Sequence, residues 1–334
     1  MANTAEPDRM IGESPAFLQA LEAVSKVAPL EKPVLVVGER GTGKELIASR
    51  LHFLSNRWDR EFLKLNCAAI SDTLIESELF GHEAGSFTGA SRTHQGRFER
   101  ASGGTLFLDE LASTSGLVQE KLLRVIEYGE FERVGGSKTL RADVRVIAAT
   151  NEDLPGLAVK GMFRMDLLDR LAFDVITLPP LRERREDILL LAEYFAINMA
   201  SELGRDFFPG FTDAASKALH VHRWPGNLRE LKNVVERAVY RAEPDEPVDE
   251  VVLDPFQSPF RPVEGGDAPQ AGLQLPLDIK STIRELEVDL VNRAMATGKF
   301  NQRRAAELLG LTYHQFRGYL KKYDDERRRE AQDG

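Results

Sequence analysis

The sequence predicts an α/β fold with a doubly wound parallel sheet, followed by helical regions. Short apolar runs alternate with helical stretches over residues 10–175, which is typical of a parallel sheet covered by helices on both faces. The apolar runs are residues 34–37, 62–65, 105–108, 144–149 and 175–178. Farther along, apolar residues recur at helical spacing between Leu228 and Val239. We therefore expect an α/β subdomain over residues 1–175 and a helical subdomain over residues 176–254.

Composition and length suggest two domains in a reducing compartment. The chain has 334 residues, of which 42% are hydrophobic, and this is enough for a sizeable core. The single cysteine, Cys67, excludes an internal disulfide and reads as a small core residue. The N-terminus lacks the apolar segment of a signal peptide, and no uncharged apolar stretch reaches the roughly 18 residues that a membrane span needs. We expect a cytoplasmic protein without membrane insertion.

The charge is unevenly distributed. The whole chain carries a net charge of −9, which disfavours indiscriminate coating of nucleic acid. Residues 299–323 contain six basic residues against one acidic residue, a net charge of +5, which leaves −14 for the rest. A small basic module on an acidic body predicts localised DNA binding.

The first strand leads into a phosphate-binding loop. Gly38–Lys44 reads Gly-Glu-Arg-Gly-Thr-Gly-Lys and stands between the apolar run Val34–Val37 and a helical stretch over residues 45–53. Strand, glycine loop and helix is the context of a Walker A motif, in which backbone amides and the lysine hold a triphosphate. The motif usually has Ser or Thr after the lysine, where Glu45 stands here, so a tight strand–helix turn remains an alternative for this segment alone. The candidate nucleotide-binding residues are Gly38, Glu39, Arg40, Gly41, Thr42, Gly43, Lys44 and Glu45.

A second strand end supplies the acidic half of a nucleotide site. The apolar run of residues 105–108 is followed by Asp109 and Glu110. An acidic pair at a strand end is often only a solvated cap. Downstream of a phosphate-binding loop, Asp109 is expected to organise Mg²⁺ through water and Glu110 to polarise the water that attacks the γ-phosphate. The pattern predicts ATP and Mg²⁺ as cofactors.

Between these two halves lies a glycine-rich loop. Residues 78–90 contain Gly81, Gly85 and Gly89, which flank the aromatic Phe87 and the hydroxyl of Thr88. Glycine disfavours regular elements because it loses the most conformational entropy on folding. We expect a protruding loop that carries Phe87 and Thr88 at its tip.

Together these motifs resemble one family, the bacterial enhancer-binding proteins, which are AAA+ ATPases that activate sigma-54 RNA polymerase. Residues 85–90 are similar to the family signature Gly-Ala-Phe-Thr-Gly-Ala, with Ser86 in place of the first alanine, and Glu45 fits the family pattern. The likeness extends from Ile11 to about Tyr323. It implies an AAA+ fold with a helical lid, and contact of Phe87 and Thr88 with sigma-54.

The resemblance also implies roles for polar residues at other strand ends. Asn66 restrains the catalytic glutamate until ATP is bound. Thr150 and Asn151 detect the γ-phosphate, although a plain strand-end turn is the alternative. Arg229 reaches over the nucleotide as a second sensor.

The resemblance also implies that Arg164 and Arg170 are arginine fingers, which enter the site of a neighbouring subunit. Surface ion pairs are the alternative for these two residues. Arginines supplied in trans require a homo-oligomer, which the family forms as a hexameric ring.

Capping residues, prolines and glycines predict where the helical subdomain and the segment after it begin and end. Asn227, after Trp-Pro-Gly, is expected to be an N-cap with Glu230 in the reciprocal position, and Trp224 a packing residue. Residues 255–276 hold five prolines and three glycines, which indicates a linker. Beyond it, a stripe at helical spacing predicts a helix that ends at Gly298 and whose apolar face is either core or the seam of a homodimer. The stripe consists of Ile279, Ile283, Leu286, Leu290 and Ala294.

The C-terminal part, residues 277–323, reads as a helix-turn-helix DNA-binding domain of Fis type. One helix spans Gln302–Leu309, Gly310 makes the turn, and Thr312–Gln315 is a capping box that opens a second helix over residues 313–322. The outward residues of the second helix are basic or aromatic: Tyr313, His314, Arg317 and Lys321. Residues 324–334 are expected to be a flexible tail.

We therefore expect a sigma-54-dependent activator that binds upstream DNA and uses ATP hydrolysis in an AAA+ ring to convert the closed sigma-54 RNA polymerase complex into an open one, at phage-shock-type stress promoters. An AAA+ remodeller of another substrate and a repressor with a vestigial ATP site are the alternatives.

Only about ten residues precede the ATPase region, so regulation is expected in trans. The resemblance implies an inhibitory partner similar to phage shock protein A, and Trp58, in the polar stretch 55–60, is either its anchor or a half-buried packing residue.

Overall fold

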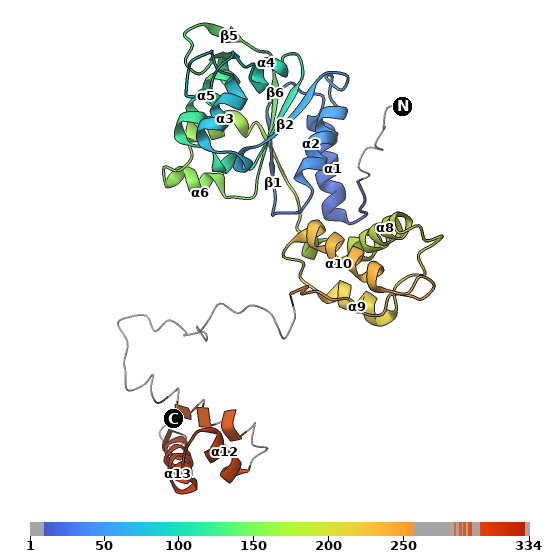
Figure 1. Ribbon diagram of the computed structural model, residues 1–334, viewed down its shortest axis with the longest axis vertical. Helices are drawn as coiled ribbons and strands as arrows, with labels where there is room; N and C mark the ends of the chain where they lie inside the picture. The colour runs from blue at the N-terminus through green and yellow to red at the C-terminus, as the bar shows by residue number, and fades with distance from the viewer. Residues whose placement is uncertain are drawn as a thin grey trace. The chain divides into compact units, whose positions relative to one another are not determined.

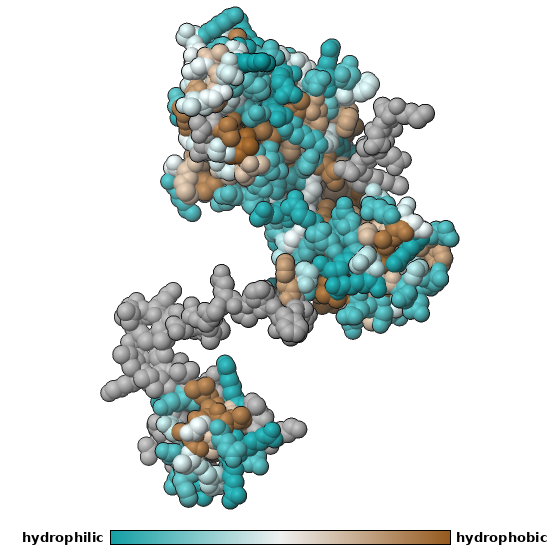
Figure 2. Space-filling model, viewed as in Figure 1, coloured by the Kyte–Doolittle hydropathy of each residue, from teal (hydrophilic) through white to brown (hydrophobic). Residues whose placement is uncertain are grey.

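The computed structural model describes residues 10–256 and 301–330, and between them residues 284, 287, 288, 290, 291 and 293–295. It forms two compact units, Met1–Pro255 and Phe256–Gly334, each described here by itself (Figure 1). Most of the linker predicted over residues 255–276 lies outside the described residues, which include only positions 255 and 256 of it. The visible surface is mainly hydrophilic, with hydrophobic side chains in separate patches (Figure 2). No described helix is long and apolar enough to cross a bilayer.

The first unit is built on a five-stranded parallel sheet, which confirms the predicted fold. The strands are β1 (Val34–Val37), β2 (Phe62–Asn66), β3 (Thr105–Asp109), β6 (Arg145–Thr150) and β7 (Asp174–Thr177). Their spatial order is β2-β3-β6-β1-β7: from β1 the chain passes to the far edge at β2, returns through β3 and the central strand β6, and ends at the other edge in β7. Because all strands are parallel, their carboxyl ends meet at one edge, where ligands bind in such sheets. The polar residues that end β2, β3 and β6, which are Asn66, Asp109 and Thr150, lie along this edge.

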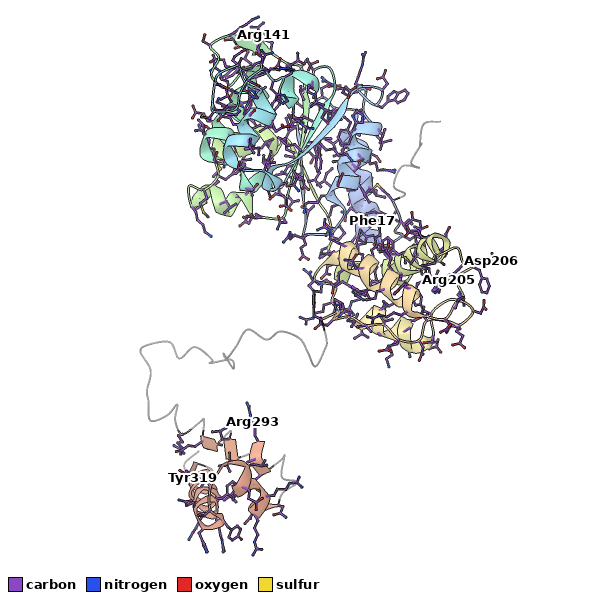
Figure 3. All side chains as sticks on the ribbon, in the orientation of Figure 1. Phe17, Arg141, Arg205, Asp206, Arg293 and Tyr319 are labelled. Atoms are coloured by element: carbon purple, nitrogen blue, oxygen red, sulfur yellow. The ribbon has the colours of Figure 1, made fainter. Side chains whose placement is uncertain are left out.

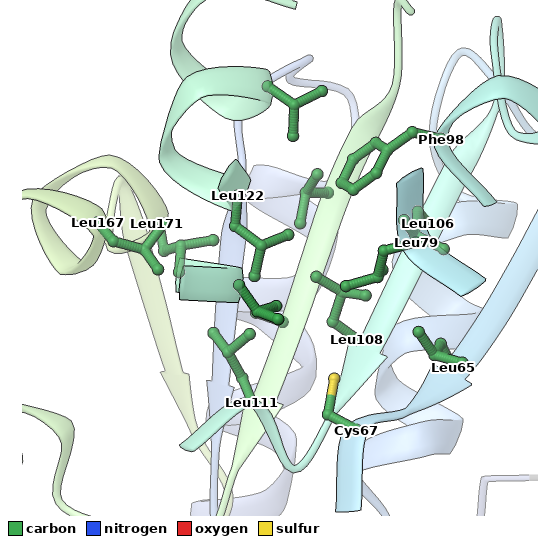
Figure 4. Close-up of a cluster of buried hydrophobic side chains, with 14 of the residues drawn as sticks. Leu65, Cys67, Leu79, Phe98, Leu106, Leu108, Leu111, Leu122, Leu167 and Leu171 are labelled. Carbon is green, nitrogen blue, oxygen red and sulfur yellow. The ribbon is translucent and has the colours of Figure 1, made fainter. Parts of the chain in front are cut away.

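Helices cover both faces of the sheet (Figure 1). On one face lie α1 (Pro15–Val27) and α2 (Lys44–Phe53), and on the other lie α3 (Asp72–Phe80), α5 (Gly116–Tyr128) and α7 (Met165–Leu171). Alternate strand residues enter the two cores: Phe107 packs with α1 and α2, whereas Leu106 and Leu108 pack with α3, α5 and α7 (Figure 4). Short elements complete the subdomain: η1 (Cys67–Ala69), α4 (Arg97–Arg100), η2 (Leu111–Ser113) and α6 (Leu154–Val159). Cys67 is 3% exposed, and burial raises the pKa of its thiol to about 12, so it is the core residue expected.

A small antiparallel hairpin was not foreseen from the sequence. It consists of β4 (Glu130–Glu132) and β5 (Thr139–Arg141). Each strand has only three residues with a single apolar side chain, which is too short for an alternating pattern to stand out in the sequence. The hairpin connects to the glycine-rich loop, because Glu83 N–H donates to the Val134 carbonyl at 3.0 Å and Val134 N–H donates to the Gly81 carbonyl at 2.9 Å.

The helical subdomain packs around Trp224. It comprises η3 (Leu181–Glu183), α8 (Glu186–Glu202), α9 (Asp213–Val221) and α10 (Asn227–Arg241). Trp224 is fully buried and its indole N–H donates to the Leu219 carbonyl at 2.9 Å, as expected for a packing residue. The apolar stripe of α10 packs into this core beside buried residues of α8 and α9, and it consists of Leu231, Val234, Val235, Ala238 and Val239.

The predicted N-cap of α10 is wrong in one respect. The helix begins at Asn227 and its N-cap is Gly226, whose N–H donates to Glu230 Oε2 at 2.7 Å. Glu230 therefore has the reciprocal capping role expected of it. Asn227 is fully buried, and its amide makes contacts outside the helix, so tertiary partners have replaced the local cap.

A buried carboxylate fixes the N-terminal segment to the helical subdomain. Asp187 accepts the N–H groups of Glu13 at 2.7 Å and of Ser14 at 2.9 Å, and it pairs with Arg184 at 2.9 Å. Burial acts to raise the pKa of Asp187, but the hydrogen bonds from Glu13 and Ser14 outweigh it and hold that pKa below its ordinary value. The Arg184 guanidinium lies 4.0 Å from the ring centroid of Phe17, which Figure 3 labels at α1.

The second unit has a small core around Phe316, between α12 (Gln302–Leu308) and α13 (Tyr313–Glu330), and Figure 3 labels Tyr319 on α13. Val291 and Ala294 join this core, but Leu290 is 42% exposed, so the expected stripe is not one buried face. Ile279, Ile283 and Leu286 lie outside the described residues. Helix α13 runs past residue 322 to Glu330, into the expected tail, because this charged segment consists of residues that tolerate a helix and contains neither Gly nor Pro.

We expect residues 1–254 to fold without the rest of the chain, because the two compact units divide at Pro255. The fragment should unfold within about 2 °C of the matching transition of the full chain, as expected when less than roughly 1 kcal/mol is lost. Thermal unfolding followed by circular dichroism measures this.

A chain that ends at Arg241 is the matched control. It loses Val248, which is 2% exposed and exchanges backbone hydrogen bonds with the segment before α9: its N–H donates to Gly210 and its carbonyl accepts from Thr212, both at 2.9 Å. This shorter fragment should be clearly less stable. Equal stability of the two fragments would contradict the boundary at Pro255.

Candidate nucleotide-binding site

The site is built around the loop that joins β1 to α2. Gly41 and Gly43 have φ angles of 77° and 98°, a conformation that favours glycine, and Gly43 is the N-cap of α2. A Cβ atom on Gly41 would collide with the Gly226 carbonyl oxygen, so this glycine also allows close approach of the helical subdomain. The N-terminus of α2, with its unpaired amides and positive dipole end, faces the space where a phosphate would lie.

Lys44 is the first residue of α2 and its side chain is nearly buried. Its Nζ donates to the carbonyls of Gly38 at 2.9 Å and Glu39 at 3.3 Å. Burial lowers the pKa of Lys44, and the charges of Glu110 and Asp109 oppose that shift. The loop thus holds the ammonium group on backbone oxygens, within the field of both carboxylates.

Asp109 is the last residue of β3 and Glu110 follows it, at the same edge of the sheet. Glu110 N–H donates to Asp109 Oδ1 at 3.0 Å, and Glu110 has a φ of 52°, which turns the chain sharply away from the strand. Both carboxylates are half-buried and line the same cleft as Lys44. Hard carboxylate oxygens opposite a lysine are a donor set that fits Mg²⁺ bound with a triphosphate.

The cleft has a volume of about 910 Å³ and lies between the phosphate-binding loop and the helical subdomain. Arg40, Lys44 and Arg229 supply positive charge beside the loop, and Glu45 also lines it. Apolar and aromatic side chains supply the other part of the lining: Met10, Ile11, Phe17, Leu191, Tyr194, Phe195 and Leu228. A cleft that combines cationic and aromatic linings suits a nucleotide. Sequence reasoning did not find the apolar lining, because its members come from three distant segments.

Two further polar residues contact the phosphate-binding loop from outside the cleft lining, and sequence reasoning missed this role for both. Arg182 makes a two-pronged ion pair with Glu39, at 2.9 and 2.7 Å. Asn227 Nδ2 donates to the Arg40 carbonyl at 3.0 Å, and Asn227 Oδ1 accepts from Leu181 N–H at 2.7 Å. A polar residue with no exposed surface in the first turn of α10 was the available signal, but a local cap explained the same pattern.

The remaining strand-end residues lie beside the cleft and not in its lining. Asn66 is opposite Asp109 in the sheet, and its side-chain oxygen accepts from Ala68 N–H at 2.9 Å. Thr150 is opposite Val37; it is fully buried, and its hydroxyl accepts from Glu152 N–H at 3.0 Å. Asn151 is exposed.

Arg164 and Arg170 are absent from the lining of the cleft in this chain. Arg164, the N-cap of α7, is paired with Asp166 at 3.1 and 2.7 Å, and Arg170 is paired with Glu127 at 2.7 Å. Within one chain, both residues therefore make the surface ion pairs that the sequence left as the alternative.

The glycine-rich loop is a tight turn with an exposed tip. Gly85 N–H donates to Ala90 at 2.7 Å, Thr88 is exposed, and the Phe87 ring contacts His82 edge-on with 4.9 Å between centroids. Ser86 faces the hairpin, where a Cβ on Gly135 would lie 2.5 Å from Ser86 Cβ.

Arg133 of the same hairpin segment braces the base of this loop. It pairs with Glu83 at 2.9 Å and with Glu99 at 2.6 Å, and the hydrogen bonds from Glu99 and Glu83 raise the pKa of Arg133. The loop is thus attached at its base, with Phe87 and Thr88 beyond the attachment.

In the second unit, Thr312 and Gln315 form the capping box that the sequence predicts: Thr312 N–H donates to Gln315 Oε1 at 3.0 Å, and Gln315 N–H donates to Thr312 Oγ1 at 3.4 Å. The four candidate DNA-contacting residues, Tyr313, His314, Arg317 and Lys321, are exposed.

Comparison with known families divides the chain into three matches. Residues 10–177 match the sigma-54 interaction domain, residues 182–258 the AAA+ ATPase lid domain, and residues 282–323 the bacterial regulatory proteins of the Fis family. The AAA+ assignment indicates ATPase activity, and the Fis match indicates binding to DNA.

Individual relatives agree with this division. The chain is 60% identical to the Psp operon transcriptional activator of Escherichia coli, over 95% of this chain and 98% of that protein. It is 45% identical to the Nif-specific regulatory protein of Azotobacter vinelandii, over 92% of this chain and 57% of that protein. Among solved structures, NtrX of Brucella abortus superposes with a TM-score of 0.70 at 33% identity, over 93% of this chain and 68% of that chain, and crystal structures of that protein with ATP and with ADP are also similar. This chain therefore belongs to the sigma-54-dependent transcriptional activators of the AAA+ family.

Proposed function

We propose that this activator hydrolyses ATP with Mg²⁺ in the cleft between its two subdomains, and that the cycle moves the loop 85–90 against sigma-54 to convert a closed promoter complex into an open one. The observation that carries the proposal is the arrangement of charge. Lys44, Asp109 and Glu110 converge on one cleft, while Phe87 and Thr88 are exposed on a loop outside it.

Within the cleft, the loop amides and Lys44 bind the phosphates. Bound Mg²⁺ would neutralise charge on the β- and γ-phosphates, and Asp109 would hold it through water. Glu110 accepts a proton from the attacking water, and its half-buried carboxylate stands at the end of β3, where that water is within reach.

Polar residues around the cleft report the state of the nucleotide. Arg229 lines the cleft from the helical subdomain and contacts the phosphates as a sensor. Thr150 and Asn151 follow the central strand β6 and sense the γ-phosphate. Asn66, opposite Asp109 in the sheet, restrains Glu110 until ATP is bound.

Hydrolysis is completed in trans. Arg164 and Arg170 are on the surface of α7, and their partners Asp166 and Glu127 lie on the same subunit. In a hexameric ring, each arginine exchanges its own acidic partner for the phosphates of the neighbouring subunit, where it neutralises charge in the transition state.

DNA and regulatory partners occupy other surfaces. Tyr313, His314, Arg317 and Lys321 of α13 enter the major groove of an upstream site. The Escherichia coli relative is named for the Psp operon, and on that ground we include phage-shock-type stress promoters in the proposal. Trp58, which is 63% exposed, anchors an inhibitory partner similar to phage shock protein A.

The two alternative functions are less favoured. A vestigial ATP site would not need the buried Lys44 or the two carboxylates that face it. A remodeller of another substrate would not need the loop signature at residues 85–90.

Replacement of Glu110 by Gln should leave nucleotide affinity unchanged and lower kcat for ATP hydrolysis by roughly 10²–10⁴-fold, because the amide cannot accept the proton. A fluorescent ATP analogue measures affinity, and phosphate release measures turnover. Lys44→Ala, as the contrasting variant, should lose affinity. Turnover near that of the parent by Glu110→Gln would remove Glu110 from the mechanism.

Replacement of Thr88 by Ala should separate hydrolysis from activation. The side chain is exposed, so stability should change by less than about 0.5 kcal/mol. ATPase activity and ring assembly should persist, while sigma-54 binding and open-complex formation are lost. Ser86→Ala, two positions away, should remain active in both assays. If Thr88→Ala loses both activities or neither, the loop does not couple them.

Replacement of Trp58 by Ala should weaken binding of a phage-shock-protein-A-like inhibitor by about 2 kcal/mol or more, as for a buried aromatic anchor. Inhibition of ATPase activity by a purified inhibitor of that kind is the measurement. Leu117→Ala, which removes a similarly exposed apolar side chain at the start of α5, is the control. Full inhibition of a correctly folded Trp58→Ala variant would contradict the assignment.

A further inference from the structure

Helix α5 contains one buried polar side chain that the proposed mechanism does not use. Gln119 is 1% exposed, and its neighbours Val118 and Leu122 belong to the apolar core. Its Nε2 donates to the Thr114 carbonyl at 2.8 Å and to the Met162 carbonyl at 3.4 Å, and its Oε1 accepts the backbone N–H of Arg164 at 2.9 Å. A buried amide that uses both ends is costly to remove, because the groups it leaves lose their partners.

One end of this amide is connected to Glu110, the proposed general base. Thr114 and Ser113 close a short turn directly after Glu110: the hydroxyl of Thr114 donates to the Leu111 carbonyl and that of Ser113 donates to the Glu110 carbonyl, both at 2.8 Å. Glu110 begins this turn in a left-handed conformation. A rotation of the Glu110 backbone is therefore transmitted through a hydrogen-bonded turn to the carbonyl that Gln119 holds.

The other end is connected to the candidate arginine finger. Arg164 is the N-cap of α7, so the hydrogen bond from its N–H to Gln119 fixes the point at which that helix starts. The same two helices pack through Leu122 of α5 and through Leu167 and Leu171 of α7 (Figure 4). Farther along, Glu127 of α5 pairs with Arg170. Thus α5 holds both arginines, but only Gln119 also contacts the turn after Glu110.

We propose that Gln119 is a positioning residue that links the turn after Glu110 to Arg164, so that the nucleotide state of one subunit sets where its arginine projects into the next subunit. This inference rests on the proposed function, in which Arg164 acts in trans. It predicts that replacing Gln119 lowers turnover at the neighbouring subunit's site and leaves nucleotide binding by its own subunit unchanged.

The test uses Gln119→Met, which keeps the length of the side chain and removes both hydrogen-bonding ends. The variant should bind a fluorescent ATP analogue as the parent does and assemble into rings, while kcat falls roughly 10- to 100-fold with little change in KM, as for a misplaced catalytic group. Gln119→Glu is the second variant, because a carboxylate still accepts from Arg164 N–H but no longer donates to Thr114; it should show an intermediate loss.

Mixed rings distinguish positioning from damage. Lys44→Ala subunits cannot use their own site but present a normal Arg164. Mixed with them, Gln119→Met subunits should regain turnover above the sum of the two variants measured alone, because their intact sites receive a correctly placed arginine. The control mixture is Arg164→Ala with Lys44→Ala, which should be rescued in the same way.

Each outcome has one reading. Rescue in both mixtures supports the inference. Rescue of the Arg164 mixture alone overturns it and leaves the proposed function intact. Failure of the Arg164 mixture rejects the arginine finger in trans, and the role of Gln119 with it. Unchanged kcat in Gln119→Met would also overturn the inference.

Discussion

The cleft depends on one buried amide, that of Asn227, which ties the helical subdomain to the phosphate-binding loop. Asn227 bonds to Arg40 on one side and to Leu181 on the other, and Leu228 N–H donates to the Gly41 carbonyl at 2.9 Å. These contacts set the distance between the loop and α10. Because Asn227 has no exposed surface, water cannot replace the bonds if the subdomain shifts. These bonds between the two subdomains therefore place Lys44 of one and Arg229 of the other at the same cleft.

Helix α5 connects the turn after Glu110, at the cleft, to the hairpin β4–β5. Helix α5 begins just after the turn that Glu110 opens and ends at Tyr128, with Gly129 as its C-cap directly before the hairpin. That hairpin segment in turn contacts the glycine-rich loop through Val134 and Arg133. A helix is stiff along its axis, so displacement at its first turn reaches its last turn without intermediate adjustment. Glu110 and the loop 85–90 are thus joined by helix α5 and by the hairpin segment that contacts the base of the loop.

The sequence predicted those elements whose formation depends on residues close together in the chain. The five parallel strands, the glycine loop before α2 and the capping box at Thr312 depend on residues near in sequence, and all are present. The hairpin β4–β5 is local, but its three-residue strands are too short to show a periodicity. The roles of Arg182 and Gln119 depend on partners tens of residues away or more, and no periodicity marks them. Asn227 was misassigned for the same reason: a local cap and a long-range tie use the same side chain, and the long-range partners were not visible.

The packing of Ser86 against the hairpin has an energetic consequence for the loop. Ser86 Oγ is buried and has no hydrogen-bonding partner among the described residues. A hydroxyl in that state costs about 1–3 kcal/mol relative to one that is hydrated. In the proposed cycle, a loop that lifts away from Gly135 would expose the hydroxyl to water and recover that cost. The cost would then favour the raised position, so that less work would have to come from the nucleotide.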